Sequence, residues 1–112
     1  MTYVKINDVQ YPATINGSMK DVNWDDRQSK SITLEMDYQE ASKIFVDRLA
    51  WHIVMVNQEE IDGEFVDVVE EFDNSDFNVA GDLTDHRDGT VTAKMGKLTD
   101  LEEAYEIMLG GI

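Results

Sequence analysis

The sequence predicts an α+β fold: a mostly antiparallel, curved sheet or small barrel of about seven strands, with two short helices near residues 37–48 and 99–109. Three observations support this fold class. Apolar and polar residues alternate over several short stretches, as in half-buried strands. Residue pairs typical of tight hairpin turns separate these stretches. Two further segments repeat apolar residues every three to four positions, as amphipathic helices do.

The first hairpin is indicated by alternation on both sides of Asn7–Asp8. Pro12 lacks a backbone donor, so we expect its strand to lie at a sheet edge or to pair on one side only there. Asn16–Gly17 predicts a second turn, followed by a short strand that carries Val22 and Trp24. After another turn at residues 25–28, residues 30–36 form the return strand.

At Asp37 the period changes to that of a helix, with Asp37 and Glu40 placed as a variant of the capping box. Its apolar stripe is expected in the core and consists of Tyr38, Ala41, Ile44, Phe45 and Leu49. Residues 51–56 are apolar on nearly both faces, His52 being the exception, which predicts a central strand. Residues 58–72 fit a helical stripe as well as a hairpin around Asp62–Gly63, and we predict that residues 64–72 are strand.

Three carboxylates and an imidazole gather in the stretch DLTDHRDGTVTAKMGK: Asp82, Asp85, His86 and Asp88. Such a group could hold a metal ion or act in acid–base chemistry. However, Asp88–Gly89 suits a tight hairpin turn between alternating strands, and the acid spacing does not match an EF-hand loop. We therefore predict a hairpin tip, and we assign no catalytic, cofactor-binding or metal-binding residue. Incidental divalent-ion binding and a metal-dependent hydrolase are the alternatives.

The last predicted helix begins with a capping box formed by Thr99 and Glu102. Gly110–Gly111 would end it with a left-handed cap. We expect its apolar stripe to pack on the sheet; the stripe consists of Leu101, Tyr105, Met108 and Leu109.

Length and composition limit the possible functions. The 112 residues are 42% hydrophobic, which suits one domain over residues 1–112 with a single core. The absence of cysteine excludes disulfides, thiolate nucleophiles and cysteine-ligated metals. No signal-peptide core or membrane span is found, so we expect a soluble, intracellular chain. No phosphate loop, dinucleotide fingerprint or hydrolase motif occurs, so we expect neither an enzyme nor a cofactor, although paired carboxylates could lie together in space.

The formal charge of −15 should repel nucleic acids and membranes. No lysine or arginine lies between Arg48 and Arg87, an interval that holds many of the acids. These acids form either a solvated face or a surface that meets something basic, such as a protein site normally occupied by DNA. The second interpretation describes an acidic DNA-mimic inhibitor of a host nucleic-acid-binding protein, and it requires carboxylates in a row at roughly 7 Å spacing.

Three stretches together resemble small proteins encoded in prophages and phage-like elements of Gram-positive bacteria, among structural or tail-region genes. They are NGSMKDVNWDDRQSKSITLEM, LAWHIVM and FDNSDFNVAGDLTDHRDGTVTAKMGK, the last followed by a short acidic helix. The resemblance spans most of the chain. It rests on the general character of the sequence rather than on a diagnostic motif, and it implies no functional residues. It implies a non-enzymatic tail, virion or assembly component, located in the host cytoplasm or in the virion.

Partners of such a component would be other phage structural proteins or a second copy of the chain. We expect contact through exposed strand edges or through an apolar patch around Trp24 or Trp51. Either tryptophan could instead fill the core, which is the more common role of an aromatic residue.

Overall fold

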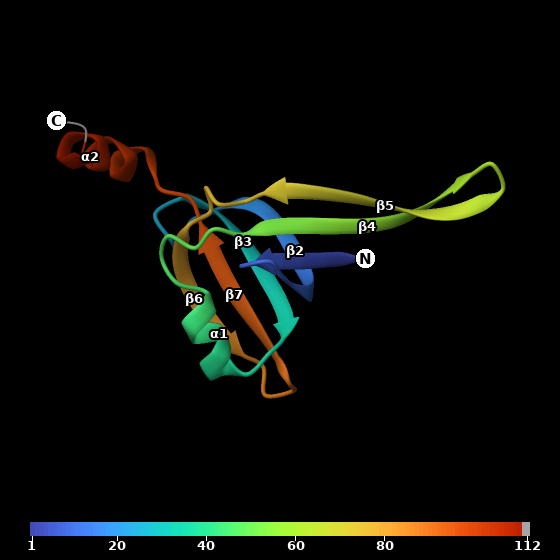
Figure 1. Cartoon of the computed structure of the whole chain (residues 1–112). Helices are drawn as coiled ribbons and strands as arrows, with labels where there is room; N and C mark the ends of the chain where they lie inside the picture. The colour runs from blue at the N-terminus through green and yellow to red at the C-terminus, as the bar shows by residue number, and fades with distance from the viewer. Residues whose placement is uncertain (111–112) are drawn as a thin grey trace.

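The computed structural model describes residues 1–110, apart from the side chains at positions 18 and 19. It confirms the α+β fold, with a seven-stranded antiparallel sheet and two helices (Figure 1). The elements are β1 (Thr2–Ile6), β2 (Val9–Asp21), β3 (Arg27–Glu35), α1 (Tyr38–Ile44), β4 (His52–Ile61), β5 (Glu64–Asp73), β6 (Val79–Asp85), β7 (Thr90–Gly96) and α2 (Asp100–Gly110). The order across the sheet is β5-β4-β1-β2-β3-β7-β6, and the sheet is open rather than closed into a barrel.

The long strand β2 joins the two halves of the sheet. Residues 9–12 of β2 pair with β1, and residues 13–21 pair with β3. The turn between β1 and β2 is Asn7–Asp8, where both residues have positive φ. Pro12 pairs with Tyr3 of β1 and has no partner on β3, as expected for a residue without an N–H donor.

The predicted turn at Asn16–Gly17 is wrong, because β2 continues through it to Asp21. The register moves from Asn16↔Ser31 to Met19↔Ser29, so three steps along β2 match two along β3. This one-residue excess is a β-bulge. Neither Asn16 nor Gly17 has a positive φ, so the pair does not adopt the backbone conformation of a tight hairpin turn. The actual turn spans residues 22–26, so Val22 and Trp24 do not lie on a strand.

Helix α1 is shorter than predicted. Asp37 is the N-cap, but its side chain makes no capping hydrogen bond, so the box with Glu40 does not form. Phe45 leaves the helical conformation with a ψ of 83°, which ends the helix, and its side chain is buried. Tyr38 is 42% exposed and is not part of the core, in contrast to the predicted stripe.

Residues 64–72 are strand, which confirms the extended interpretation. β4 and β5 pair in unbroken register from His52↔Asp73 to Ile61↔Glu64. The turn is Asp62–Gly63, with φ of 54° and 83°. β4 lies between β5 and β1 and is therefore an internal strand, as predicted for residues 51–56.

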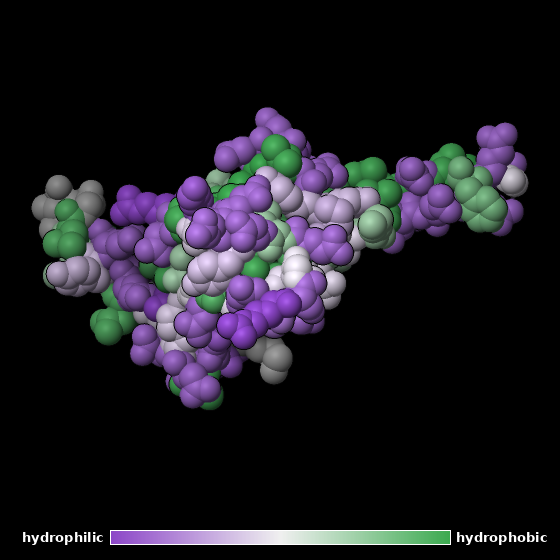
Figure 2. Space-filling model, turned by 90° about the horizontal axis from the view of Figure 1, so that it is seen from below, coloured by the Kyte–Doolittle hydropathy of each residue, from purple (hydrophilic) through white to green (hydrophobic). Residues whose placement is uncertain are grey.

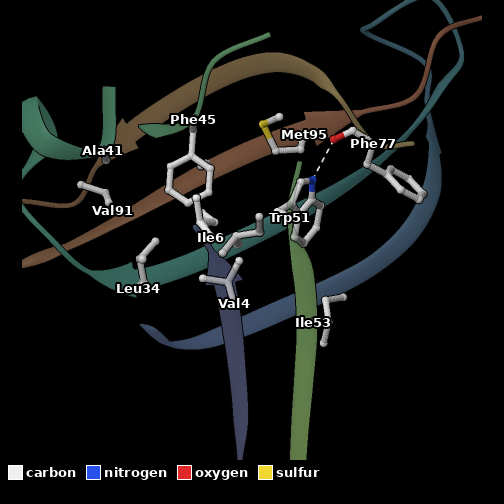
Figure 3. Close-up of a cluster of buried hydrophobic side chains, with 12 residues drawn as sticks. Val4, Ile6, Leu34, Ala41, Phe45, Trp51, Ile53, Phe77, Val91 and Met95 are labelled. Atoms are coloured by element: carbon white, nitrogen blue, oxygen red, sulfur yellow. Dashed lines mark hydrogen bonds between the residues drawn. The ribbon is translucent and has the colours of Figure 1, made fainter. Parts of the chain in front are cut away.

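The core lies on the inner face of the curved sheet, between β1 and β4 on one side and β3 and β7 on the other, with Ala41 of α1 and Trp51 before β4 packed against it (Figure 3). Trp51 is fully buried, and its indole Nε1 donates a hydrogen bond to the carbonyl oxygen of Phe77 at 2.9 Å. The cluster consists of Val4, Ile6, Ile32, Leu34, Ala41, Phe45, Trp51, Ile53, Phe77, Val91, Ala93 and Met95.

Two elements project from this body in opposite directions, the far end of the β4–β5 hairpin and helix α2 (Figure 1). The molecule measures 56 × 36 × 26 Å. Its radius of gyration is 16.4 Å, whereas about 13 Å is typical of a compact domain of this size. The projections account for the excess.

Candidate functional site

The acids and the histidine of the stretch 82–88 lie on the β6–β7 hairpin, as predicted for a turn. Asp88 accepts hydrogen bonds from the backbone N and the Oγ1 of Thr90, at 3.0 and 2.6 Å. These two bonds hold the pKa of Asp88 below its ordinary value. Asp85 accepts from the backbone N of Arg87 at 2.9 Å, and Gly89 has a φ of 89°. The acids therefore stabilise the turn.

These residues do not converge on a common point. The His86 side chain is exposed, and its Nε2 lies 2.7 Å from the Thr92 hydroxyl. Asp82 lies farther along β6, in the irregular stretch between Ala80 and Leu83 where the register with β7 shifts. Among residues 1–110, no group of three or more His, Asp and Glu side chains is placed to hold a metal ion.

Neither tryptophan forms an exposed apolar patch. Trp51 is part of the core. Trp24 is half-buried, with the Arg27 guanidinium 4.7 Å and the Lys94 ammonium 5.9 Å from its ring centre. A Cβ on Gly96 would lie 2.9 Å from the Trp24 ring, so the ring packs closely on the backbone of β7.

Helix α2 is attached to the body through its first turn. The predicted capping box forms: Thr99 N donates to Glu102 Oε1 at 2.9 Å, and Glu102 N donates to Thr99 Oγ1 at 3.3 Å. The buried Arg27 side chain donates to both carboxylate oxygens of Glu102, at 2.6 and 3.0 Å, and to the Lys97 carbonyl oxygen. The Arg27 guanidinium and the Thr99 backbone lower the pKa of Glu102 to about 2.

The rest of α2 does not pack on the sheet, in contrast to the prediction. Consecutive residues lie about 100° apart around a helix, so the Arg27–Glu102 pair turns Tyr105 and Leu109 toward the body. These two side chains border an open cleft of about 900 Å³ beside Val79. The predicted glycine cap includes Gly111, which lies outside the described residues.

The predicted core stripe of α2 is therefore exposed to solvent. Leu101 and Met108 lie roughly 100–120° around the helix from Glu102, next to Tyr105, and do not line the cleft. The exposed fractions are 81% for Leu101, 63% for Tyr105, 65% for Met108 and 70% for Leu109. An amphipathic helix whose apolar face is uncovered is a candidate contact surface.

The second projection is the part of the β4–β5 hairpin that no other strand covers, residues 57–68, which we call the arm. Thr2, the first residue of β1, pairs with Met55, and the residue before it, Met1, bonds to the backbone of Val56. Beyond that point β4 and β5 pair only with each other. Figure 2 shows hydrophobic and hydrophilic residues interleaved along this projection.

Exposed apolar residues occur on both faces of the β4–β5 hairpin. Directly paired residues share a face, so Phe65, paired with Glu60, lies on the opposite face to Val66, paired with Glu59. Phe65 is 72% exposed and Ile61 is 52% exposed. A sheet with one covered face would instead alternate apolar and polar residues.

The sequence did not predict that residues 57–68 would project from the sheet. The available signal was the mixture of valine, phenylalanine and acids without strict alternation in EFVDVVEEF, residues 64–72. This pattern left the choice between helix and strand open, although it also fits a ribbon that no second layer covers.

No protein-family model matches the chain, and neither a curated protein nor a solved structure is significantly similar to it. None of the helices within residues 1–110 has the length and apolar content needed to cross a bilayer.

Proposed function

We propose that the chain is a non-enzymatic structural or assembly protein, encoded by a phage or phage-like element, that acts through protein–protein contacts. The observation that carries this proposal is the exposed apolar stripe of α2. Burying a side chain such as Leu101 or Met108 contributes about 1.5–3 kcal/mol. A partner that covers α2 would gain this free energy, which the body of the protein leaves unused.

The attachment of α2 supports the same role. The capping box and the Arg27–Glu102 pair fix the first turn of α2 to the body. The helix is thereby formed and oriented before a partner arrives, so binding orders few additional residues. A helix that docks in a partner's groove through residues i, i+4 and i+7 is a common mode of protein recognition. Leu101, Tyr105 and Met108 have this spacing.

The proposal is tested by co-expressing the chain with the products of neighbouring genes and measuring the molar mass of the purified species by light scattering. We expect a complex or a defined oligomer, located in the host cytoplasm or in the virion. The double variant Leu101→Glu, Met108→Glu should abolish it while the body stays folded, because neither side chain lines the cleft beside the body. Glu103→Gln is the matched control on the polar side of α2. If the chain stays monomeric both by itself and when co-expressed with each neighbouring gene product, the proposal is contradicted.

A second candidate function is the acidic inhibitor of a basic, nucleic-acid-binding protein. It is favoured by the absence of lysine and arginine between Arg48 and Arg87. It has less support, because the arm divides its acids between both faces and interleaves them with apolar residues. This alternative predicts a complex that is weakened by salt and displaced by duplex DNA, whereas docking through α2 predicts that DNA has no effect.

A further inference from the structure

Strand β5 forms one edge of the sheet, and its outer side has no partner within residues 1–110. The two-residue turn Asp62–Gly63 closes on the pair Ile61↔Glu64, and hydrogen-bonded pairs then alternate with non-hydrogen-bonded pairs along the hairpin. Two backbone bonds show which pairs are which. Val56 bonds to Met1 on the side away from β5, so Val56↔Val69 is a non-hydrogen-bonded pair of the hairpin, and the bond from Asn74 N to Trp51 O has the same alternation. The backbone groups that point outward therefore belong to Phe65, Asp67, Val69, Glu71 and Asp73.

The two edges of the sheet differ in how they are protected. On β6, the Asp47 carboxylate accepts from the backbone N of Ala80 at 2.8 Å. The backbone of Arg48 bonds to Asn78 beside that strand, and the register of β6 shifts. Strand β5 is longer, at ten residues, and has no proline and no bulge in its pairing with β4. Bulges, prolines, covering loops and charged side chains are the usual devices that block an edge, and of these β5 has only charged side chains, its acids.

The side chains along β5 combine two properties. Phe65 and Val69 are 72% and 60% exposed, and they flank Asp67 on one face. The acids of the strand are Glu64, Asp67, Glu70, Glu71 and Asp73. Two of these acids have basic partners: Glu71 contacts Lys5 Nζ at 3.2 Å and His52 Nδ1 at 3.0 Å, and Asp73 lies 3.7 Å from His52 Nε2. In the described structure Glu64, Asp67 and Glu70 form no ion pair.

Charge decides which strand can pair with this edge. A second copy of β5 would bring its own five acids next to the five of this strand, and like charges on adjacent strands are destabilising. The same acids attract lysine and arginine. On the face of Phe65, Asp67 and Val69, the complementary order is apolar, basic, apolar.

We propose that the outer edge of β5 accepts an extended segment of a partner protein, in which lysine or arginine alternates with apolar residues, as an eighth strand of the sheet. The backbone groups of Phe65, Asp67 and Val69 bind the main chain of this segment, and the acids of β5 select its charge. This inference rests on the proposed function, since it describes the chemical character of one partner. The surface that it involves, the edge of β5, is separate from α2.

The test is titration of the whole chain with a synthetic peptide of about nine residues that alternates lysine and valine, followed by nuclear magnetic resonance. We expect the amide signals of Phe65, Asp67, Val69 and Glu71 to shift and to gain protection from hydrogen exchange. Affinity should fall as salt is raised. A matched peptide with glutamate in place of lysine should not bind, and methylation of alternate backbone nitrogens in the lysine peptide should abolish binding.

Val69→Pro removes one outward N–H and leaves the ladder with β4 intact, because the Val69 N–H takes no part in that ladder. Its loss should weaken binding of the lysine–valine peptide about tenfold. Val69→Ala keeps the N–H and is the control, with a change of about threefold or less. If Val69→Pro does not fold, the methylated peptide still decides the question.

Three results would overturn the inference: no shift at β5, equal binding of the methylated peptide, or shifts scattered over acidic residues without protection of β5 amides. Failure here leaves the proposed function intact if the α2-dependent complex still forms. Conversely, peptide binding at β5 without any such complex would support the inference about the β5 edge and contradict the proposed assembly role.

Discussion

At the scale of single residues, the contact between Arg27 and Glu102 determines how α2 is attached. Arg27 is 4% exposed, so its charge is costly to leave unpaired. The Glu102 carboxylate neutralises it and also caps the first turn of α2. One acid thus joins the body to its projecting helix.

The depressed pKa of Glu102 predicts a specific pH dependence. A carboxyl whose pKa is about 2 in the folded chain, against an ordinary 4.5, stabilises the fold above pH 5 and loses this contribution as the pH falls toward 2. Glu102→Gln should lower the free energy of unfolding at neutral pH by about 1–2 kcal/mol, a modest value because solvent screens the partly exposed carboxylate.

Urea unfolding followed by tryptophan fluorescence measures this difference across pH. The gap between Glu102→Gln and the unchanged chain should close near pH 2. Glu103→Gln, the adjacent acid without an arginine partner, should show no comparable gap. A gap that persists at low pH would contradict the assigned role of the ion pair.

Gly96 provides a second prediction at this scale. A Cβ there would lie 2.5 Å from Arg27 Cδ and 2.9 Å from the Trp24 ring. Gly96→Ala should therefore lower the free energy of unfolding by about 1–3 kcal/mol through overpacking. Gly17→Ala is the control, because nothing lies within 4 Å of its added Cβ. Equal stability of the two variants in thermal unfolding would show that the packing around Trp24 is looser than described.

At the scale of elements, the arm and the core use the same residue types for different purposes. Phe45 is 8% exposed and belongs to the core, whereas Phe65 is 72% exposed on the arm. Phe45→Ala should lower the free energy of unfolding by about 3–5 kcal/mol. Phe65→Ala should change it by less than about 0.5 kcal/mol. Chemical denaturation compares the two, and a large cost at Phe65 would mean that the arm is covered.

The elements also separate what the sequence can predict from what it cannot. Two-residue turns such as Asn7–Asp8 and Asp62–Gly63 are local, so both hairpins were predictable. The turn at Asn16–Gly17 was a wrong prediction because these residues permit a tight turn without requiring one, and pairing with β3 keeps the chain extended there. The apolar stripe of α2 was found, but periodicity does not reveal which surface covers it.

At the scale of the whole molecule, the arm exists because neighbouring strands differ in length. β4 and β5 have ten residues each, whereas β1 has five. The order of strands in the sheet depends on contacts between residues far apart in the sequence. Local sequence patterns therefore could not predict that the arm projects. The hairpin around Asp88–Gly89, in contrast, was predictable as a turn because its residue types act locally.

We therefore propose that the sheet is a scaffold for two contact surfaces, α2 and the outer edge of β5. Hydrogen exchange of the chain, free and within the complex obtained by co-expression, tests this claim most directly. We predict that protection increases at residues 64–73 or 100–109, with little change in β3 and β7. Protection confined to the body, or centred on residues 82–88, would contradict the account.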